Sequence, residues 1–276
     1  MHKNSGKKEN ILRNSAFQTI IASLLCIVLG LFVGYIVLLI INPAGAGEAI
    51  VAIMKNFLYY PSAAAATKYL GTTLVKASAL LMCSLSVLFA YKVGLFNIGA
   101  AGQYVVGVGA CLYFALRFNM PWYVCLIAAI MTAALVGGIS GALKAYSVGI
   151  NVYTMRYAGV LISGALGGLG GLVYITAGVS EWKFENGVAG FGFLALAVMI
   201  FGQWRPVNIG LAALLFGLFR ALSNVYTGFD ALVALKLPST IYNMLPYIIS
   251  LIVLVFVSGK SRAPKAEGIP YDKGQR

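Results

Sequence analysis

The sequence predicts an all-α, polytopic integral membrane protein with about eight transmembrane helices. Sixty-one per cent of its 276 residues are hydrophobic, ten per cent are charged, and the mean hydropathy is +0.89. A soluble domain of this length could not cover so much apolar surface with so few charges. The apolar residues also gather in runs of about 20, the length that crosses a hydrocarbon core of about 30 Å. The composition and the run lengths together exclude a soluble globular class.

Eight apolar runs are long enough, or nearly long enough, to be spans. The sixth is the shortest, and we expect it to be tilted, broken or re-entrant. Glycine and proline interrupt several of the others, which membrane helices tolerate when neighbouring helices satisfy the freed backbone groups. The expected spans are residues 17–41, 73–91, 98–116, 122–143, 158–176, 190–203, 207–226 and 241–258.

The first run could be taken for a secretory signal peptide, because basic residues precede it. It is longer than the roughly 7–15 residues of a cleavable apolar region, so we interpret it as a retained helix. Residues 42–72 then form the longest connection on the predicted outer side. Within it, residues 45–60 are partly amphipathic, which predicts a helix that lies along the membrane surface.

The net charge of +13 could suggest a nucleic-acid partner, but the positions of the charges exclude one. Residues 1–16 form a basic N-terminus and residues 259–276 a basic C-terminal tail, on either side of a transmembrane domain at 17–258. Basic flanks mark the cytoplasmic ends of spans. We therefore predict a multi-pass protein of the cell membrane with both termini in the cytoplasm. The acidic residues near the membrane fall in predicted outer segments: Glu48, Glu181, Glu185 and Asp230.

Residue types that carry catalysis or bind metals are scarce. His2 is the only histidine and lies in the polar N-terminal tail, which excludes the usual histidine-based metal and acid–base sites. The four cysteines lie in apolar runs without CxxC spacing, and we interpret them as small buried hydrophobes. No carboxylate lies at the centre of a predicted span, which argues against proton-driven transport by this chain alone. We predict no enzymatic activity, no cofactor and no metal site.

A nucleotide-binding loop is also missing. The GKS sequence at 259–261 resembles the end of a P-loop, but Leu254 occupies the position that requires the first glycine. Any energy derived from ATP must therefore come from a partner chain.

The most distinctive polar stretch inside an apolar run is at residues 96–103. Asn97 and Gln103 carry amides, which both donate and accept hydrogen bonds and so suit a polar, uncharged solute. Gly99 and Gly102 expose backbone beside them. We predict that these four residues border a substrate path. The alternative is structural: Asn97 caps a helix and Gln103 makes a buried bond between helices.

Two further features lie inside the spans. Arg220 is in the seventh run, where an ionisable residue is a candidate for function. Its alternative role is to extend outward towards Asp230. Glycines spaced four residues apart in the fourth and fifth runs predict close approach of helix backbones. One interpretation of that spacing is helix packing within one subunit. The alternative interpretation is that these glycines line a pore or form a contact between subunits.

Residues 73–103, and above all YKVGLFNIG at 91–99, resemble the permease subunits of bacterial ABC importers for nucleosides and simple sugars. Three other stretches agree, in the family's order. VGIN at 148–151 with RYAG at 156–159 resembles the cytoplasmic loop that contacts the ATPase. GFGF at 190–193 through FGQWRP at 201–206 resembles the family's short span. APK at 263–265 with GIPY at 268–271 resembles its C-terminal tail.

The chain departs from this family in two places. Relatives usually carry glutamate where this chain has Ala101. The chain is also predicted to be internally shortened near 146–148, where GALKAY at 141–146 runs almost directly into VGIN. Relatives have two spans, an outer loop and the front half of the contact loop between these stretches. Loss of two spans preserves the orientation of both ends.

The resemblance implies a permease that moves a nucleoside or a simple sugar across the cytoplasmic membrane by alternating access, driven by a separate ATPase. It implies as partners a cytoplasmic ATP-binding subunit, a second permease subunit, an extracytoplasmic solute-binding protein or lipoprotein, and the lipid bilayer. Two other classes stay open: an ATP-independent channel or facilitator, and a shortened permease that assembles without transporting. The resemblance assigns the ATPase contact to an inner loop at 144–157, with Lys144, Gly149, Asn151, Tyr153 and Arg156 as its candidates.

Overall fold

The computed structural model describes residues 15–58, 62–95, 97, 99–145, 151–178 and 190–257, and the regular structure within these ranges is helical throughout. Five described helices are long and apolar enough to cross a membrane, and three shorter apolar helices accompany them. The chain is therefore an all-helical, multi-pass membrane protein, as the sequence predicts. The five long stretches are Ala66–Lys92, Ala100–Phe118, Trp122–Ile139, Tyr157–Ala177 and Pro206–Gly228; the shorter ones are Val28–Ile41, Phe191–Phe201 and Ser239–Ile252.

Every expected span coincides with a helix, and the amphipathic stretch at 45–60 contains helix α2; its position along the membrane surface remains a prediction. The helices that correspond to the eight spans are α1 (Ser15–Ile41), α3 (Ala63–Lys92), α4 (Ala100–Phe118), α5 (Trp122–Ala145), α6 (Asn151–Val173), α7 (Phe191–Phe201), α8 (Pro206–Val225) and α10 (Ser239–Val257). The remaining elements are α2 (Ala46–Leu58), the π-helical turn η2 (Tyr174–Gly178), the 3-10 turn η4 (Tyr226–Gly228) and α9 (Asp230–Ala234).

Helix boundaries differ most from expectation at α3 and α6. Helix α3 begins at Ala63, ten residues before the expected start at 73, because alanines at 63–66 favour a helix although their hydropathy is modest. Helix α6 begins at Asn151 rather than at 158, since no glycine or proline interrupts the residues between. Hydropathy marks where a helix enters lipid, whereas helix propensity decides where the helix starts.

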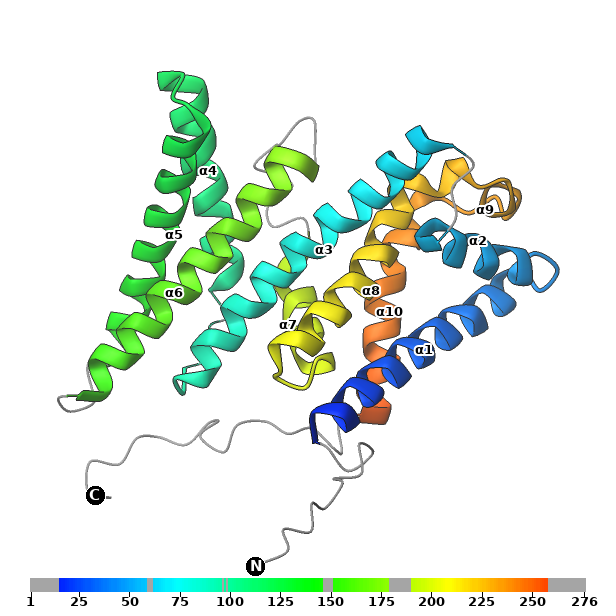
Figure 1. Ribbon diagram of the computed structural model, residues 1–276, viewed down its shortest axis with the longest axis horizontal. Helices are drawn as coiled ribbons and strands as arrows, with labels where there is room; N and C mark the ends of the chain where they lie inside the picture. The colour runs from blue at the N-terminus through cyan, green and yellow to red at the C-terminus, as the bar shows by residue number, and fades with distance from the viewer. Residues whose placement is uncertain are drawn as a thin grey trace, which may run out of the picture.

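Helix α3 is the central helix of the bundle (Figure 1). Helices α4, α5 and α6 pack on one side of it, and α8, α10 and α1 lie on the other, with α7 between the two groups. The first residue of α1 and the last of α10 lie at the same end of the bundle, and α2 and α9 lie at the opposite end. That arrangement agrees with an even number of spans. Which end faces the cytoplasm remains a prediction.

Helices α4, α5 and α6 approach closely through glycines. A β-carbon on Gly107 of α4 would lie 2.7 Å from the Cα of Gly168, and one on Gly137 of α5 would lie 2.7 Å from the carbonyl oxygen of Val160. No side chain fits at either point, so the backbones are in direct contact. The close approach that the glycine spacing predicts is confirmed, and it occurs within one subunit.

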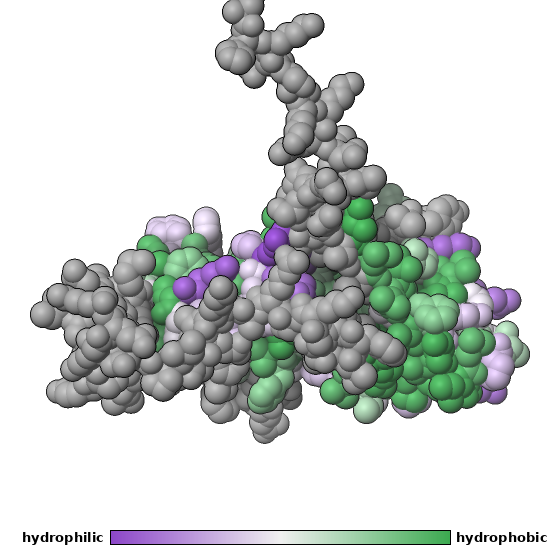
Figure 2. Space-filling model, turned by 90° about the horizontal axis from the view of Figure 1, so that it is seen from below, coloured by the Kyte–Doolittle hydropathy of each residue, from purple (hydrophilic) through white to green (hydrophobic). Residues whose placement is uncertain are grey.

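The two outermost helices carry exposed apolar stripes. Four residues of α5, spaced four apart, are each more than half exposed, and α1 has a similar stripe. Figure 2 shows hydrophobic surface along the α1 flank of the bundle. Such stripes match a lipid-facing surface. The stripe residues are Ile127, Met131, Leu135 and Ile139 on α5, and Leu25, Val28, Phe32 and Ile40 on α1.

Candidate functional site

The two amides singled out by the sequence are bonded to each other. Asn97 lies between α3 and α4, and Gln103 lies in the first turn of α4. The Asn97 side-chain nitrogen donates to the Gln103 side-chain oxygen over 2.9 Å and to the hydroxyl oxygen of Ser163 on α6 over 2.6 Å. Asn97 is 7% exposed and Gln103 is 1% exposed. The pair therefore forms a buried link between α4 and α6.

Ser163 extends this link to α3. Its hydroxyl donates to the backbone oxygen of Ser86 over 2.6 Å, and the Ser86 hydroxyl donates to the backbone oxygen of Ser163 over 2.6 Å. Both serines are fully buried. We call Ser86, Asn97, Gln103 and Ser163 the amide cluster. Its hydrogen bonds provide the interhelical contact that the structural alternative expects for Gln103; whether its amides also border a solute path remains a prediction.

The glycines of the same stretch lie apart from the amide cluster's interior. Gly102 is exposed, and a β-carbon there would meet no atom within 4 Å. Gly99 is also exposed, and a β-carbon there would lie 3.2 Å from the side-chain oxygen of Asn97. The four predicted path residues are therefore neighbours in space, but only Asn97 and Gln103 are buried.

Four of the five predicted ATPase-contact residues lie at the end of α5 and the start of α6. Lys144 is in the last turn of α5, and Asn151, Tyr153 and Arg156 fall in the first two turns of α6. Gly149 lies outside the described residues. Helix α6 includes the second half of the expected inner loop at 144–157, whereas the membrane-length apolar part of this helix begins at Tyr157. The helix continues there because the segment from 151 contains no helix breaker.

A second buried group, which the sequence reasoning missed, surrounds Lys76 of α3. Lys76 is only 5% exposed. Its Nζ lies 3.4 Å from the hydroxyl oxygen of Tyr174 in η2 and 4.9 Å from the centroid of that ring. On the facing helix α8, the guanidinium carbon of Arg220 lies 5.7 Å from the ring centroid of Phe191, and Nη1 donates to the Asn243 side-chain oxygen over 3.3 Å. Two cations thus lie against aromatic rings inside the bundle.

Three aromatic rings meet at this point. The Tyr174 and Phe191 centroids are 4.9 Å apart with nearly perpendicular planes, and the Tyr104 centroid lies 6.4 Å from Tyr174 and 6.2 Å from Phe191. Tyr104 is fully buried, and its hydroxyl has no hydrogen-bond partner among the described residues. We call Lys76, Tyr104, Tyr174, Phe191 and Arg220 the cation–aromatic cluster.

Two irregular elements build the cation–aromatic cluster. Tyr174 opens the π-helical turn η2 at the end of α6, a geometry that is frequent at functional sites. Phe191 opens α7, which has 11 residues and is therefore about 16 Å long, roughly half of a hydrocarbon core. The expected short sixth span is thus a half-length helix whose first residue lies in the cluster.

Gly190 allows this close approach. Its φ of 76° is in the left-handed region, and a β-carbon there would collide with the hydroxyl of Tyr247 and lie 3.2 Å from a terminal nitrogen of Arg220. Its carbonyl oxygen accepts a hydrogen bond from the Tyr247 hydroxyl over 3.1 Å. The beginning of α7 is therefore fixed beside the Arg220 guanidinium.

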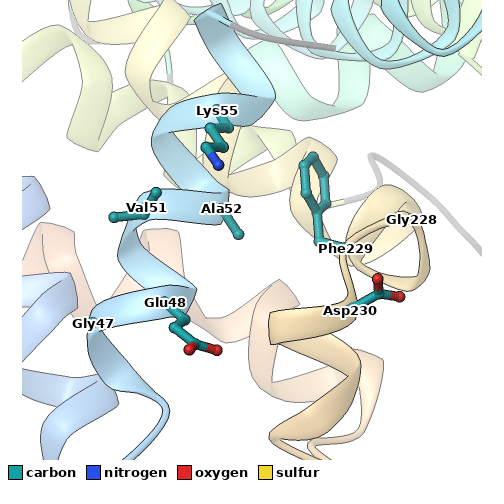
Figure 3. A pocket seen from close by; sticks show the side chains of 8 residues that line it. All are labelled: Gly47, Glu48, Val51, Ala52, Lys55, Gly228, Phe229 and Asp230. Carbon is teal, nitrogen blue, oxygen red and sulfur yellow. The ribbon is translucent and has the colours of Figure 1, made fainter. Parts of the chain in front are cut away.

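An open cavity of about 670 Å³ lies between α2 and the η4–α9 turn (Figure 3). Glu48 and Lys55 line this α2–α9 cavity from α2, and Phe229 and Asp230 line the opposite wall. Its charged lining suits an aqueous contact rather than lipid. The cavity lies at the end of the bundle opposite the start of α1.

Comparison with known proteins identifies a family. The family described as "Branched-chain amino acid transport system / permease component" matches residues 69–147 and 144–258, which together are most of the chain. The two matches meet at 144–147, beside the shortening predicted near 146–148. The shortening itself remains a prediction. No solved structure matches the chain.

Three curated relatives illustrate the similarity. The nucleoside ABC transporter permease protein NupC of Lactococcus lactis is 44% identical over 129 residues, 47% of this chain and 40% of the relative. The guanosine ABC transporter permease protein NupQ of Bacillus subtilis is 42% identical over 136 residues, 49% and 41% of the two chains. The putative glucose ABC transporter permease protein TsgC13 of Haloferax volcanii is 35% identical over 76 residues, 28% and 23%. The chain spans about two fifths of the first two relatives' length.

Proposed function

This chain belongs to the family of branched-chain amino acid transport system permease components, and we propose that it forms the transmembrane path of an ABC-type importer. The single observation that carries the proposal is the family match over residues 69–258. The cargo we propose is a nucleoside, since two relatives with more than 40% identity are named for nucleoside or guanosine transport. A simple sugar comes second, on the shorter similarity to a putative glucose permease.

The mechanism we propose is alternating access driven by ATP hydrolysis in a separate cytoplasmic subunit. An ATPase drives a permease only through a contact whose free energy differs between the two access states. We assign that contact to Lys144, Gly149, Asn151, Tyr153 and Arg156. Helix α6 begins in this region and continues into η2, which carries Tyr174. A displacement at the start of α6 would therefore be transmitted along this continuous helical segment to the cation–aromatic cluster.

The partners and the orientation are part of the same proposal. Both termini would lie in the cytoplasm, which puts the α2–α9 cavity on the outer surface. The charged lining of that cavity would receive an extracytoplasmic solute-binding protein. A second permease subunit would complete the transmembrane unit, because relatives of this class are expected to work in pairs.

A second candidate function is a shortened permease that assembles with its partners but does not transport. The observation that favours it is the meeting of the two family matches at 144–147, where relatives are expected to have two more spans. Fewer helices around the path would leave less structure to hold two access states. An ATP-independent facilitator is the remaining alternative.

The test is radiolabelled uptake in a bacterial strain that lacks nucleoside import. The chain is co-expressed with the ATPase, second permease and binding protein proposed as its partners, once with an active ATPase and once with the P-loop lysine of the ATPase replaced. We expect guanosine uptake only with the active ATPase. Guanosine uptake that is equal with the active and the inactive ATPase would establish a facilitator. Co-purification of the subunits without uptake would establish the second candidate, and failure of both assembly and uptake would overturn the proposal.

A further inference from the structure

We propose that the cation–aromatic cluster is a solute-binding site inside the membrane and that it selects 6-oxopurine rings over 6-aminopurine rings. This inference rests on the proposed function, because it names the site and the ligand class of that transport path. Three independent features of the described residues lead to it. They are a buried ammonium with a single hydrogen bond, a buried hydroxyl with no hydrogen-bond partner among those residues, and the first residue of a half-length helix.

The first feature is Lys76. An ammonium group has three donors, and its one hydrogen bond here is the 3.4 Å contact with Tyr174. Among the described residues no carboxylate forms an ion pair with it; the two described acids, Glu48 and Asp230, line the α2–α9 cavity. A buried charge held at depth in a span is costly, and such residues commonly mark substrate paths. The free donors of Lys76 are available to a ligand.

The second feature is the Tyr104 hydroxyl. Tyr104 is fully buried, yet its hydroxyl has no hydrogen-bond partner among the described residues. A buried orphan donor is disfavoured unless another state of the protein satisfies it. Its ring contacts those of Tyr174 and Phe191, so a flat ligand between these rings would stack on them and reach the hydroxyl.

The third feature is the beginning of α7. Phe191 is its first residue, and the guanidinium of Arg220 lies over the Phe191 ring. The amino end of a helix carries a partial positive charge, and half-length membrane helices commonly direct that end at a solute. This end therefore adds to the positive potential of Lys76 and Arg220 at one place.

These groups define the chemistry of the ligand. Two positive charges lie beside the rings, and the Tyr104 hydroxyl can donate, so the favoured partner is a flat ring whose edge carries acceptors. The O6 and N7 atoms of a 6-oxopurine form such an edge and pair well with lysine or arginine. A 6-aminopurine has an amino donor in place of O6, which would face the cations. A free sugar has neither a flat aromatic ring nor the O6 and N7 acceptor edge of a 6-oxopurine.

The rings must separate for a ligand to enter. Tyr174 and Phe191 are in direct edge contact, with centroids 4.9 Å apart. Tyr174 belongs to a π-helical turn, a local departure from regular α-helix that is frequent at functional sites. The same ring would then bind the solute in one access state and close the path in another.

Equilibrium binding to the full chain in lipid nanodiscs tests the site. Radiolabelled guanosine is the probe, with adenosine and ribose as competitors. We expect guanosine to bind about tenfold or more tightly than adenosine, the discrimination of one good bidentate pair. Tyr104→Phe removes a hydroxyl that has no partner within the described protein, so the unfolding temperature should stay unchanged while guanosine binds about three- to tenfold more weakly.

Two other variants complete the test. Tyr242→Phe is the matched control, because Tyr242 is equally buried but its hydroxyl donates to the Leu232 backbone oxygen over 3.0 Å. It should lower the unfolding temperature and leave guanosine affinity unchanged. Lys76→Met should abolish the preference for guanosine over adenosine, and Lys76→Arg should retain part of it.

The outcomes separate this inference from the proposed function. Guanosine affinity that is equal in the wild type and in Tyr104→Phe, or a preference for guanosine that survives Lys76→Met, overturns the site even if the chain transports. Loss of ATPase-dependent uptake in every condition overturns the proposed function, whereas saturable guanosine binding that depends on Tyr104 would still support the site.

Discussion

Gly217 of α8 lies directly against Ala77 of α3: a β-carbon on Gly217 would be 2.7 Å from the Cα of Ala77. Lys76 precedes Ala77 in sequence, and Arg220 follows Gly217 by three residues. The crossing of α3 and α8 therefore occurs beside both cations of the cation–aromatic cluster. Because no side chain separates the two backbones at this point, the contact sets how closely α3 and α8 approach.

The first prediction concerns this crossing. Gly217→Val adds a side chain where none fits, and overpacking of this kind costs about 1–3 kcal/mol or more. We expect a lower unfolding temperature in detergent and less folded protein in the membrane. Gly210→Val is the matched control on the same helix, because a β-carbon on Gly210 meets no atom within 4 Å. Equal behaviour of the two variants would contradict the close crossing.

The second prediction concerns the amide cluster. Gln103→Leu removes the acceptor of one Asn97 hydrogen bond, and an unpaired buried amide costs about 1–3 kcal/mol. We expect a lower unfolding temperature. Gln203→Leu is the control, because the Gln203 amide makes only a 3.4 Å bond to Ile200 in the preceding turn. Equal unfolding temperatures of the two variants would contradict the structural role of Gln103.

Uptake per folded molecule tests the separate prediction that Gln103 borders the solute path. If Gln103 contacts the solute, uptake divided by the amount of folded Gln103→Leu protein should fall. If the amide only links helices, uptake should fall in proportion to folded protein and the quotient should stay constant.

The third prediction concerns orientation and uses the two ends of one helix. Helix α3 has 30 residues and is about 45 Å long, so its ends must lie on opposite sides of the membrane. In a chain without its native cysteines, Ser62→Cys should react with an impermeant thiol reagent in intact cells, and Lys92→Cys should react only after permeabilisation. Both native residues are exposed. The reverse labelling pattern would place the termini outside and overturn the predicted topology.

The sequence predicts the helices well because hydropathy is a local property. Each expected span became a helix, and the amphipathic stretch near Glu48 became α2. The predicted helix boundaries were less accurate where a segment has high helix propensity but modest hydropathy, as at the alanine-rich start of α3. Helix α9 has five residues and is too short to give a hydropathy signal, so that element was not predicted.

The cation–aromatic cluster could not be predicted as a whole, because its residues come from separate helices. Tyr104, Tyr174 and Phe191 look like ordinary apolar positions until α4, η2 and α7 are brought together. Lys76 did carry a local signal, because it is an ionisable residue inside an expected span. Arg220 was recognised by that criterion. The same criterion, applied to every span, would have identified Lys76 as well.

The last prediction concerns coupling through α6. This helix has 23 residues, so about 34 Å separate Asn151 from Tyr174 in the following turn η2. The front half of the predicted contact loop is expected to be missing, and with it part of the ATPase interface. A smaller contact should transmit less differential free energy between the access states. We therefore expect the chain to bind its ATPase but to show weak stimulation of ATP hydrolysis by solute.

A cysteine at Asn151 provides the measurement. In membranes that contain the co-expressed ATPase, Asn151→Cys should crosslink to the ATPase. Tyr113→Cys is the control, because Tyr113 is exposed near the C-terminal end of α4, and it should not crosslink. Solute-stimulated ATP hydrolysis is scored in the same membranes. Strong crosslinking together with robust stimulation of ATP hydrolysis by solute would show that a half-loop couples fully. That result would contradict the prediction of weak stimulation. Absence of crosslinks from Asn151, Tyr153 and Arg156 alike would remove the docking assignment itself, because these positions occupy the first two turns of the helix that would have to receive the ATPase.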